Sequence, residues 1–227
     1  MKKSTILWLS ILLVAIISTA VYGLNEKKSL VNNIYITKHD IERANDLSVT
    51  TIPYENNQFF KNNVTSIEQL EKFSDTVIKV KLFDSFKSQR FYFSTLTPVQ
   101  VLNVYKGDSL KPNDIINIFE LFYFGKEDCK TQDGYNMMIK NHEYILFLKK
   151  SKNPSYNVEG NKDFLYTPIS SMYAKYDISS KTPVKIININ NIKYKDVKDF
   201  EIITLNKKVV DKYLQFKGQV IKKYEDK

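Results

Sequence analysis

The side chains of this 227-residue chain best suited to catalysis or metal binding are those of Cys129 and His142, a thiol and the nearer of two imidazoles in the sequence. A thiol acts as a nucleophile when a base is positioned beside it. The same pair with an acidic neighbour could begin a zinc site, but tetrahedral zinc usually takes three or four such ligands, and His39 lies far away in sequence. A lone pair in a polar loop indicates neither a catalytic site nor a zinc site. Cys129 could instead join two chains through a disulfide.

Acidic residues surround Cys129 in the stretch "EDCKTQDG", where Glu127, Asp128 and Asp133 precede Gly134. A calcium loop needs acidic residues at alternating positions, which this stretch lacks, so it reads as a solvated loop. The chain also has no Gly-x-Ser-x-Gly elbow and no supported Ser-x-x-Lys context. We therefore assign no catalytic, metal-binding or cofactor-binding residue and expect a protein that is not an enzyme. Its carboxylates are spread evenly, so an enzyme with a dispersed site, a glycosidase for example, remains an alternative.

The tripeptide Lys106-Gly107-Asp108 allows three interpretations: an adhesion-type tip, a phosphate-holding loop, or a turn between strands. A phosphate-holding loop needs several glycines that lead into a helix. Here a single glycine is followed by Pro112, Asn113 and Asp114, all of them turn-forming residues, and then by an apolar run. The stretch is therefore predicted to connect two strands.

An apolar leader precedes all of these residues. Lys2 and Lys3 are followed by a stretch without charge that lasts until Glu26, which suits an anchor crossing a bilayer over residues 4–24, since about 20 apolar residues span one as a helix. Ser18-Thr19-Ala20 could serve as a cleavage site, so secretion after cleavage is the alternative. The short basic start favours an N-terminus in the cytosol. We expect a single-pass membrane protein with most of the chain on the extracytoplasmic side.

The amino-acid composition restricts both the cellular compartment and the class of binding partner. With one cysteine, no disulfide forms within the chain, and export without disulfides favours a bacterial envelope. The net charge is +9, yet arginine occurs only at Arg43 and Arg90. Recognition of base edges and bidentate phosphate contacts depends on arginine, so nucleic acid is not expected as a partner. A lysine-rich surface suits an anionic polymer or lipid headgroups, or it simply keeps the domain soluble.

The remainder of the chain alternates in the pattern of strands. Strands are expected over residues 76–83, 90–105, 115–124 and 143–150, and shorter ones within 163–169, 173–178 and 184–189. Pro98 lies inside the second of these, so that strand should have an edge, a bulge or a bend there. Five or more short strands rich in Ile, Val, Phe and Tyr indicate a small barrel or sandwich.

Helical spacing appears at the two ends of this strand-rich region. "SIEQLEKF" begins with Ser66 and Gln69 in capping-box positions, and residues 37–47 could hold one short helix. In the tail an apolar stripe repeats at helical spacing, formed by Val209, Tyr213, Phe216, Val220 and Tyr224. This amphipathic helix should pack on the barrel or, alternatively, lie on the membrane surface. The simplest division is an anchor or signal segment (1–24), a juxtamembrane stalk (25–64) and a β-rich domain with a C-terminal helix (65–227).

The strand region resembles a class of bacterial exported domains with an OB-type barrel, themselves similar to the netrin-like and metalloprotease-inhibitor modules of animals. The residues that carry the resemblance are "SDTVIKVKLF", "VQVLNVYKGDSLKPNDIINIFE" and "GYNMMIKNHEYILFLKK", and it covers roughly residues 66–180. It implies a mainly β fold with helices (α+β), built on a small OB-like barrel, and a binding role. The animal inhibitors chelate zinc through an N-terminal cysteine and carry disulfides. Cys129 stands alone here, so the resemblance does not extend to protease inhibition.

Together these observations predict a membrane-tethered or exported module that binds an envelope protein, an anionic polymer or a lipid headgroup, without a cofactor. A structural or immunity-type envelope protein is a further alternative. An exposed patch of aromatic and lysine side chains would favour binding. A deep pocket with two or more convergent titratable groups would favour an enzyme.

Overall fold

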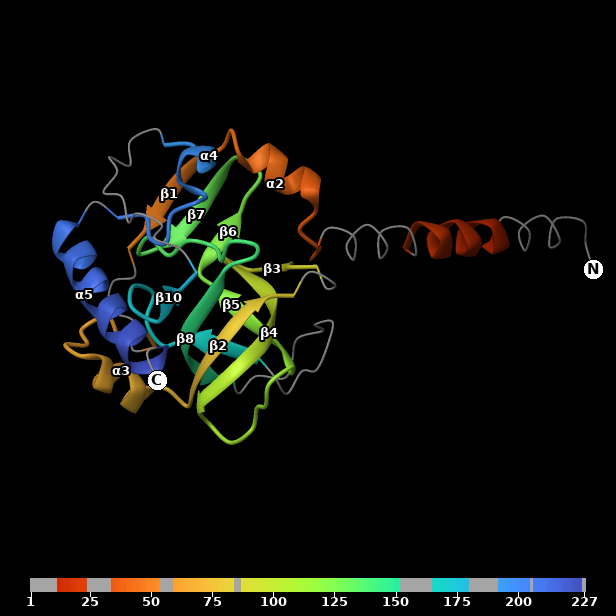
Figure 1. Ribbon diagram of the computed structural model, residues 1–227. Coiled ribbons are helices and arrows are strands. Elements are labelled where there is room, and N and C mark those ends of the chain that lie inside the picture. Colours follow the sequence, from red (N-terminus) through yellow and green to blue (C-terminus); the bar gives the residue numbers. More distant parts are fainter. Residues whose placement is uncertain are drawn as a thin grey trace, which may run out of the picture. The chain divides into compact units, whose positions relative to one another are not determined.

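The computed structural model describes residues 12–23, 34–53, 59–83, 87–151, 165–179, 192–204 and 206–225 (Figure 1). The chain divides into two units, residues 1–35 and 36–227. In the first unit, residues 12–23 form a helix whose side chains are all exposed. Ser18 Oγ donates to Val14 O and Thr19 Oγ1 donates to Ala15 O, both at 2.8 Å, so these hydroxyl groups find acceptors within the helix.

The predicted membrane anchor, residues 4–24, is described only over its second half. Within the described residues, no helix is both long enough and apolar enough to cross a membrane.

Five strands of the second unit close into a barrel. They are β2 (Thr76–Leu82), β4 (Ser94–Lys106), β5 (Ile115–Glu120), β8 (Glu143–Lys150) and β9 (Leu165–Pro168). The order around the barrel is β2-β4-β5-β9-β8, and β8 pairs with β2 to complete the circuit. Neighbours are antiparallel except β5 and β9, which are parallel. This crossed strand order in a five-stranded barrel is consistent with the predicted OB-like barrel.

Strand β8 shows why the barrel sequence is so apolar. Tyr144, Leu146 and Leu148 pack in the cluster that fills the barrel, whereas Ile145 and Phe147 belong to a second cluster outside it. Successive side chains of a strand point to opposite faces, so burial on both faces requires a continuous apolar run. The expected strand at 143–150 is confirmed with the same bounds.

Two helices cover the outer face of β8. They are α3 (Ile67–Phe73) and α5 (Lys207–Tyr224), which lie side by side beside the barrel (Figure 1). The predicted stripe of α5 is buried in the outer cluster through Val209, Tyr213, Phe216 and Val220, with Tyr224 packed against it. The tail helix therefore uses its apolar side to pack on the barrel.

The start of α3 forms half of the expected capping box. Ser66 Oγ accepts a hydrogen bond from Gln69 N at 3.4 Å. Gln69 Oε1 accepts from Thr65 N at 2.9 Å, one residue before the position that a complete box requires.

A three-stranded sheet extends one end of the barrel. Its order is β1 (Ser48–Ile52), β7 (Asp128–Gln132) and β6 (Phe122–Phe124), with β1 parallel to β7. The short helices α2 (Lys38–Ala44) and α4 (Tyr194–Val197) lie at the same end (Figure 1). The helix expected within residues 37–47 is confirmed as α2, with Thr37 as its N-cap.

The folded domain begins earlier than the sequence predicts. Residues 25–64 were expected to form a stalk, yet the compact unit starts at Ile36. Ala44, Val49 and Val64 are buried, and β1 pairs with β7, a strand about 80 residues further along the chain. Residues 36–53 and 59–64 of the expected stalk therefore belong to the folded domain.

Two expected strands are each divided into two. The segment 90–105 contains β3 (Gln89–Phe91) and β4, separated by a turn at Tyr92 and Phe93. The segment 115–124 is divided at Leu121 into β5 and β6, which belong to different sheets.

Three shorter strands were expected after residue 160. Those within 163–169 and 173–178 are confirmed as β9 and β10 (Lys175–Asp177). The strand expected at 184–189 lies outside the described residues. Pro98 pairs with Asn117 of β5 and lies just beyond the last pair between β4 and β2, Val99 with Leu82.

Candidate functional site

The structure places Cys129 and His142 in different parts of the fold. Cys129 is a free thiol buried in the core of the three-stranded sheet. Burial raises the pKa of this thiol to about 12, with Asp128 adding to the shift, and a reactive cysteine shows the opposite shift. His142 precedes β8, and its Nδ1 lies 2.6 Å from Asp177 Oδ2. The pair therefore forms no nucleophile, and the buried thiol is poorly placed to bridge two chains.

The acidic stretch 127–134 forms β7 and the turn after it. Asp133 Oδ2 accepts hydrogen bonds from Ser171 Oγ at 2.5 Å and from Asn62 Nδ2 at 3.1 Å. Gly134 has a φ of 84°, and an added Cβ would lie 1.9 Å from Ile203 O, so only glycine fits this turn. Among the described residues no group of three His, Cys, Asp or Glu side chains is placed to hold a metal ion.

The Lys106-Gly107-Asp108 stretch lies at the end of β4, in the connection to β5, as expected. Lys106 Nζ donates to Glu71 O at 2.5 Å and to Ser74 O at 2.7 Å. A lysine that bonds the last carbonyls of a helix stabilises its C-terminal end, here that of α3. The lysine of this tripeptide thus has a structural role.

A buried polar cluster lies where the barrel, the three-stranded sheet and α5 meet, and Lys175 of β10 is at its centre. Lys175 is 5% exposed, and its Nζ donates to Asn136 O. The same nitrogen lies 4.3 Å from the ring centroid of Tyr135 and 5.5 Å from that of Tyr144, both within cation–π range. Burial lowers the pKa of Lys175 to about 8, and nearby carboxylates oppose this shift only in part.

Glu120, the last residue of β5, is the first carboxylate near Lys175. It is fully buried, and Oε2 accepts from Thr97 Oγ1 at 2.6 Å while Oε1 accepts from Met138 N at 2.7 Å. Burial raises the pKa of Glu120, against the attraction of Lys175 and these hydrogen bonds. The carboxylate joins β4, β5 and the segment that precedes β8.

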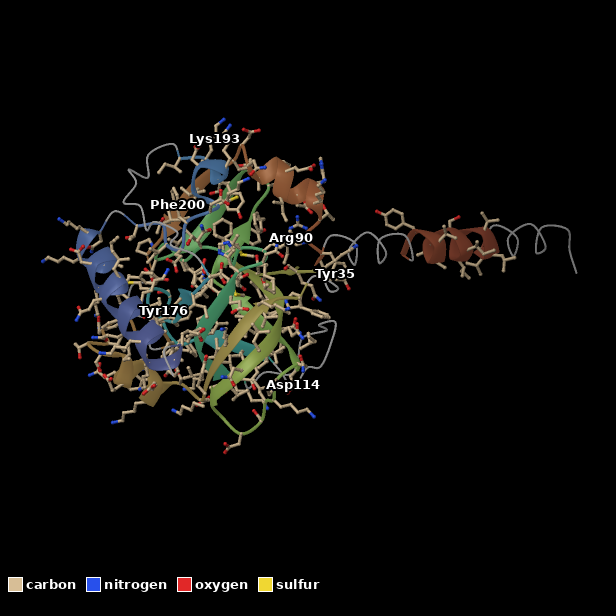
Figure 2. All side chains as sticks on the ribbon, in the orientation of Figure 1. Tyr35, Arg90, Asp114, Tyr176, Lys193 and Phe200 are labelled. Atoms are coloured by element: carbon tan, nitrogen blue, oxygen red, sulfur yellow. The ribbon has the colours of Figure 1, made fainter. Side chains whose placement is uncertain are left out.

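Glu201 connects the cluster to α5. Its Oε2 lies 2.7 Å from Lys217 Nζ, and its Oε1 accepts from Tyr213 OH at 3.1 Å and from Asp177 N at 2.8 Å. Burial raises the pKa of Glu201, and Lys217 opposes that shift. Tyr176 of β10, labelled in Figure 2, belongs to the same cluster. Its ring stacks on that of Tyr213 with centroids 5.1 Å apart.

The sequence alone did not reveal this cluster. Its signals are single charged residues inside apolar strand runs, Glu120 in "IINIFELFYF" and Lys175 in "YAKYDI". A charged residue in such a run usually lies on the solvent face of its strand. These two are buried because the barrel, the three-stranded sheet and α5 meet around them. Their side chains are bonded within the protein and closed to solvent, which fits joining three elements better than turning over a substrate.

A second feature is an exposed aromatic hairpin in the connection between the first two barrel strands, β2 and β4. Strand β3 pairs with β4 from Gln89 to Phe91, and Phe91 packs on Phe119 with ring centroids 5.1 Å apart. At the turn Tyr92 is 75% exposed and Phe93 is 62% exposed. Tyr92 has a φ of 48°, in the left-handed region that aromatic residues rarely occupy.

The hairpin is fastened to the N-terminal end of the compact unit. Arg90 Nη2 forms an ion pair with Asp40 Oδ1 of α2 at 2.6 Å, and Ser88 O accepts from Ile36 N at 2.8 Å. Figure 2 shows Arg90 on the side of the barrel near α2. Burial acts to raise the pKa of Asp40, but hydrogen bonds from Thr37 and Arg90 outweigh it and hold this pKa below its usual value.

A groove of about 410 Å³ lies beside α3. Lys61 Nζ lies 5.7 Å from the ring centroid of Phe73, which is 41% exposed. The groove is lined by Phe60, Lys61, Asn62, Asn63, Val64, Gln69, Lys72 and Phe73. These residues provide amides, lysines and aromatic rings but neither a carboxylate nor an imidazole, so Lys61 and Lys72 are the titratable groups of the groove.

Comparison of the chain with protein-family models, with curated proteins and with solved structures finds no match.

Proposed function

We propose that this chain is a binding module tethered to a bacterial cell membrane, with its barrel on the extracytoplasmic side and no catalytic role. The apolar leader supplies the tether, or a secretion signal if it is cleaved. The barrel supplies a rigid scaffold for a contact with an envelope protein, an anionic polymer or lipid headgroups.

The exposed aromatic hairpin is the observation that carries this proposal. In OB-type barrels the connection between the first two strands is one of the loops that contact ligands. Here that connection presents Tyr92 and Phe93 to solvent while Phe91 and Arg90 fix its base. Aromatic side chains lose little conformational entropy on binding and dominate many interfaces. An arm that is held at its base and presents two exposed rings is suited to binding.

An envelope enzyme is the alternative from a different class. The lowered pKa of Lys175 favours it, because perturbed pKa values gather at active sites. The burial of Lys175 and Glu120 favours the binding module, because a substrate would have to open the core to reach them.

The test is capture of an envelope component by the tagged full-length chain from detergent extracts. Replacing both rings, Tyr92→Ser with Phe93→Ser, should weaken capture about 30-fold, equivalent to about 2 kcal/mol for a central aromatic contact. The matched control is Leu214→Ser, which removes an apolar side chain that is 48% exposed on α5. Capture that is unchanged in the double variant, or lost equally in the control, would show that the hairpin is not the contact.

A further inference from the structure

The hairpin turn carries two strongly exposed aromatic residues, and the ring of Tyr92 packs edge-on against Phe91 with ring centroids 5.0 Å apart. Two-residue hairpin turns favour Gly, Asn and Asp, because these residues adopt positive φ at little cost. Tyr92 adopts a φ of 48° instead, a backbone conformation that is unfavourable for a residue with a Cβ atom, and exposes 75% of its surface. Phe93 is almost as exposed, and its ring touches the fold only at Tyr123, 6.3 Å away, among the ring contacts of the described residues. Strain and exposure together indicate a contact outside the domain.

The position of the hairpin in the chain limits which partners its exposed rings can contact. The hydrogen bond from Ile36 N to Ser88 O joins the hairpin to the first residue of the compact unit. Only residues 25–35 separate the leader from Ile36 in the sequence. Eleven residues reach at most about 40 Å when fully extended. If the leader crosses the bilayer, chain length alone keeps the hairpin within about 40 Å of the membrane surface.

The chemistry around the turn suits the boundary between headgroups and acyl chains. Tyrosine is enriched at that boundary, where its ring is buried and its hydroxyl stays hydrated. Lys38 and Lys87 are exposed on the segments joined to the hairpin, and lysine side chains near an anionic membrane surface are attracted to its headgroups. The charge of Asp40 is balanced by Arg90, although Glu42 partly offsets Lys38.

We propose that Tyr92 and Phe93 insert into the interfacial layer of the bilayer that holds the leader, so that the hairpin docks the domain against its own membrane. The inference rests on the proposed function, because it requires the leader to be in the membrane.

The test uses the full-length chain in vesicles of zwitterionic and anionic lipids, with tryptophan as a depth reporter. Trp8 is the only tryptophan of the chain, so Trp8→Phe gives a silent background. Into it are placed Phe93→Trp at the tip or Leu214→Trp on α5. Bromine atoms near the headgroup end of the acyl chains should quench the emission of the tip reporter and leave that of the α5 reporter unchanged.

Flotation of the vesicles separates the two ways in which this can fail. A chain that does not float with the vesicles overturns both the tether and the docking. A chain that floats with an unquenched tip overturns the docking alone and leaves the tether standing. If the tip emission shifts to the blue as the protein concentration rises but bromine does not quench it, the tip contacts a second copy of the chain. If bromine quenches both reporters equally, the domain adsorbs to the vesicle without a preferred face. Either result contradicts the proposal.

Discussion

Replacing Glu201 with alanine is expected to lower the free energy of unfolding by about 3–5 kcal/mol, the cost of breaking a buried ion pair on one side. The carboxylate holds Lys217 and Tyr213 of α5 and the backbone of Asp177 in β10. Its loss removes the carboxylate opposite the largely buried ammonium group of Lys217 and one of the two acceptors of the Tyr213 hydroxyl, which keeps Lys175 O at 2.8 Å. The measurement is the urea midpoint of the full chain in detergent, with the slope of the transition unchanged.

Two further variants show whether the effect comes from burial. Glu201→Gln keeps an acceptor for Tyr213 but loses the charge opposite Lys217, so its loss of stability should be intermediate. Glu42→Ala removes an exposed partner of Lys38 and should change stability by less than about 0.5 kcal/mol. If Glu201→Ala were as mild as Glu42→Ala, α5 would not be locked to the barrel through this carboxylate.

The second large effect is a pH dependence caused by Lys175. Its pKa is about 8 in the folded protein and 10.5 for an ordinary lysine, so between these values the unfolded chain binds a proton that the folded chain has released. Stability therefore rises with pH across that window. The free energy of unfolding of the wild type, relative to that of Lys175→Met, should therefore increase by about 3 kcal/mol between about pH 8 and pH 10.5. This follows because a shift of one pKa unit corresponds to about 1.36 kcal/mol.

The difference between the two proteins isolates this lysine from other groups. Burial raises the pKa of Cys129 and of the buried Tyr213, so these groups remove stability as the pH rises, in the wild type and the variant alike. Lys38→Met, at a lysine whose side chain is 91% exposed, should show a constant difference from wild type. A constant difference for Lys175→Met as well would contradict the buried environment assigned to Lys175.

Local patterns in the sequence predict much of the fold. The run 143–150 contains a short, continuously apolar stretch, which predicts β8, and the tail repeats at helical spacing, which predicts α5. The turn residues between Gly107 and Asp114 likewise mark the connection between β4 and β5.

Features that depend on distant pairing were not predicted. Strand β1 is short and follows a polar stretch, and it becomes a strand because β7 provides a parallel partner about 80 residues away. The cluster around Lys175 has the same origin, since Glu120, Lys175 and Glu201 come from three separate segments. The hairpin was not predicted because residues 90–105 were interpreted as one strand, whereas the structure places a turn at Tyr92 and Phe93 between the paired strands β3 and β4.

The proposed binding module must lie outside the cytosol on a membrane tether, and the reactivity of one introduced thiol tests this directly. Cys129 is buried with a raised pKa, so it should stay unlabelled in the folded protein, whereas Asp108→Cys places a thiol in the exposed connection after β4. A maleimide that cannot cross the cytoplasmic membrane is added to bacterial cells before or after that membrane is opened. We predict full labelling before opening, on a chain that sediments with the membranes. Labelling only after the membrane is opened would place the domain in the cytosol and contradict the account.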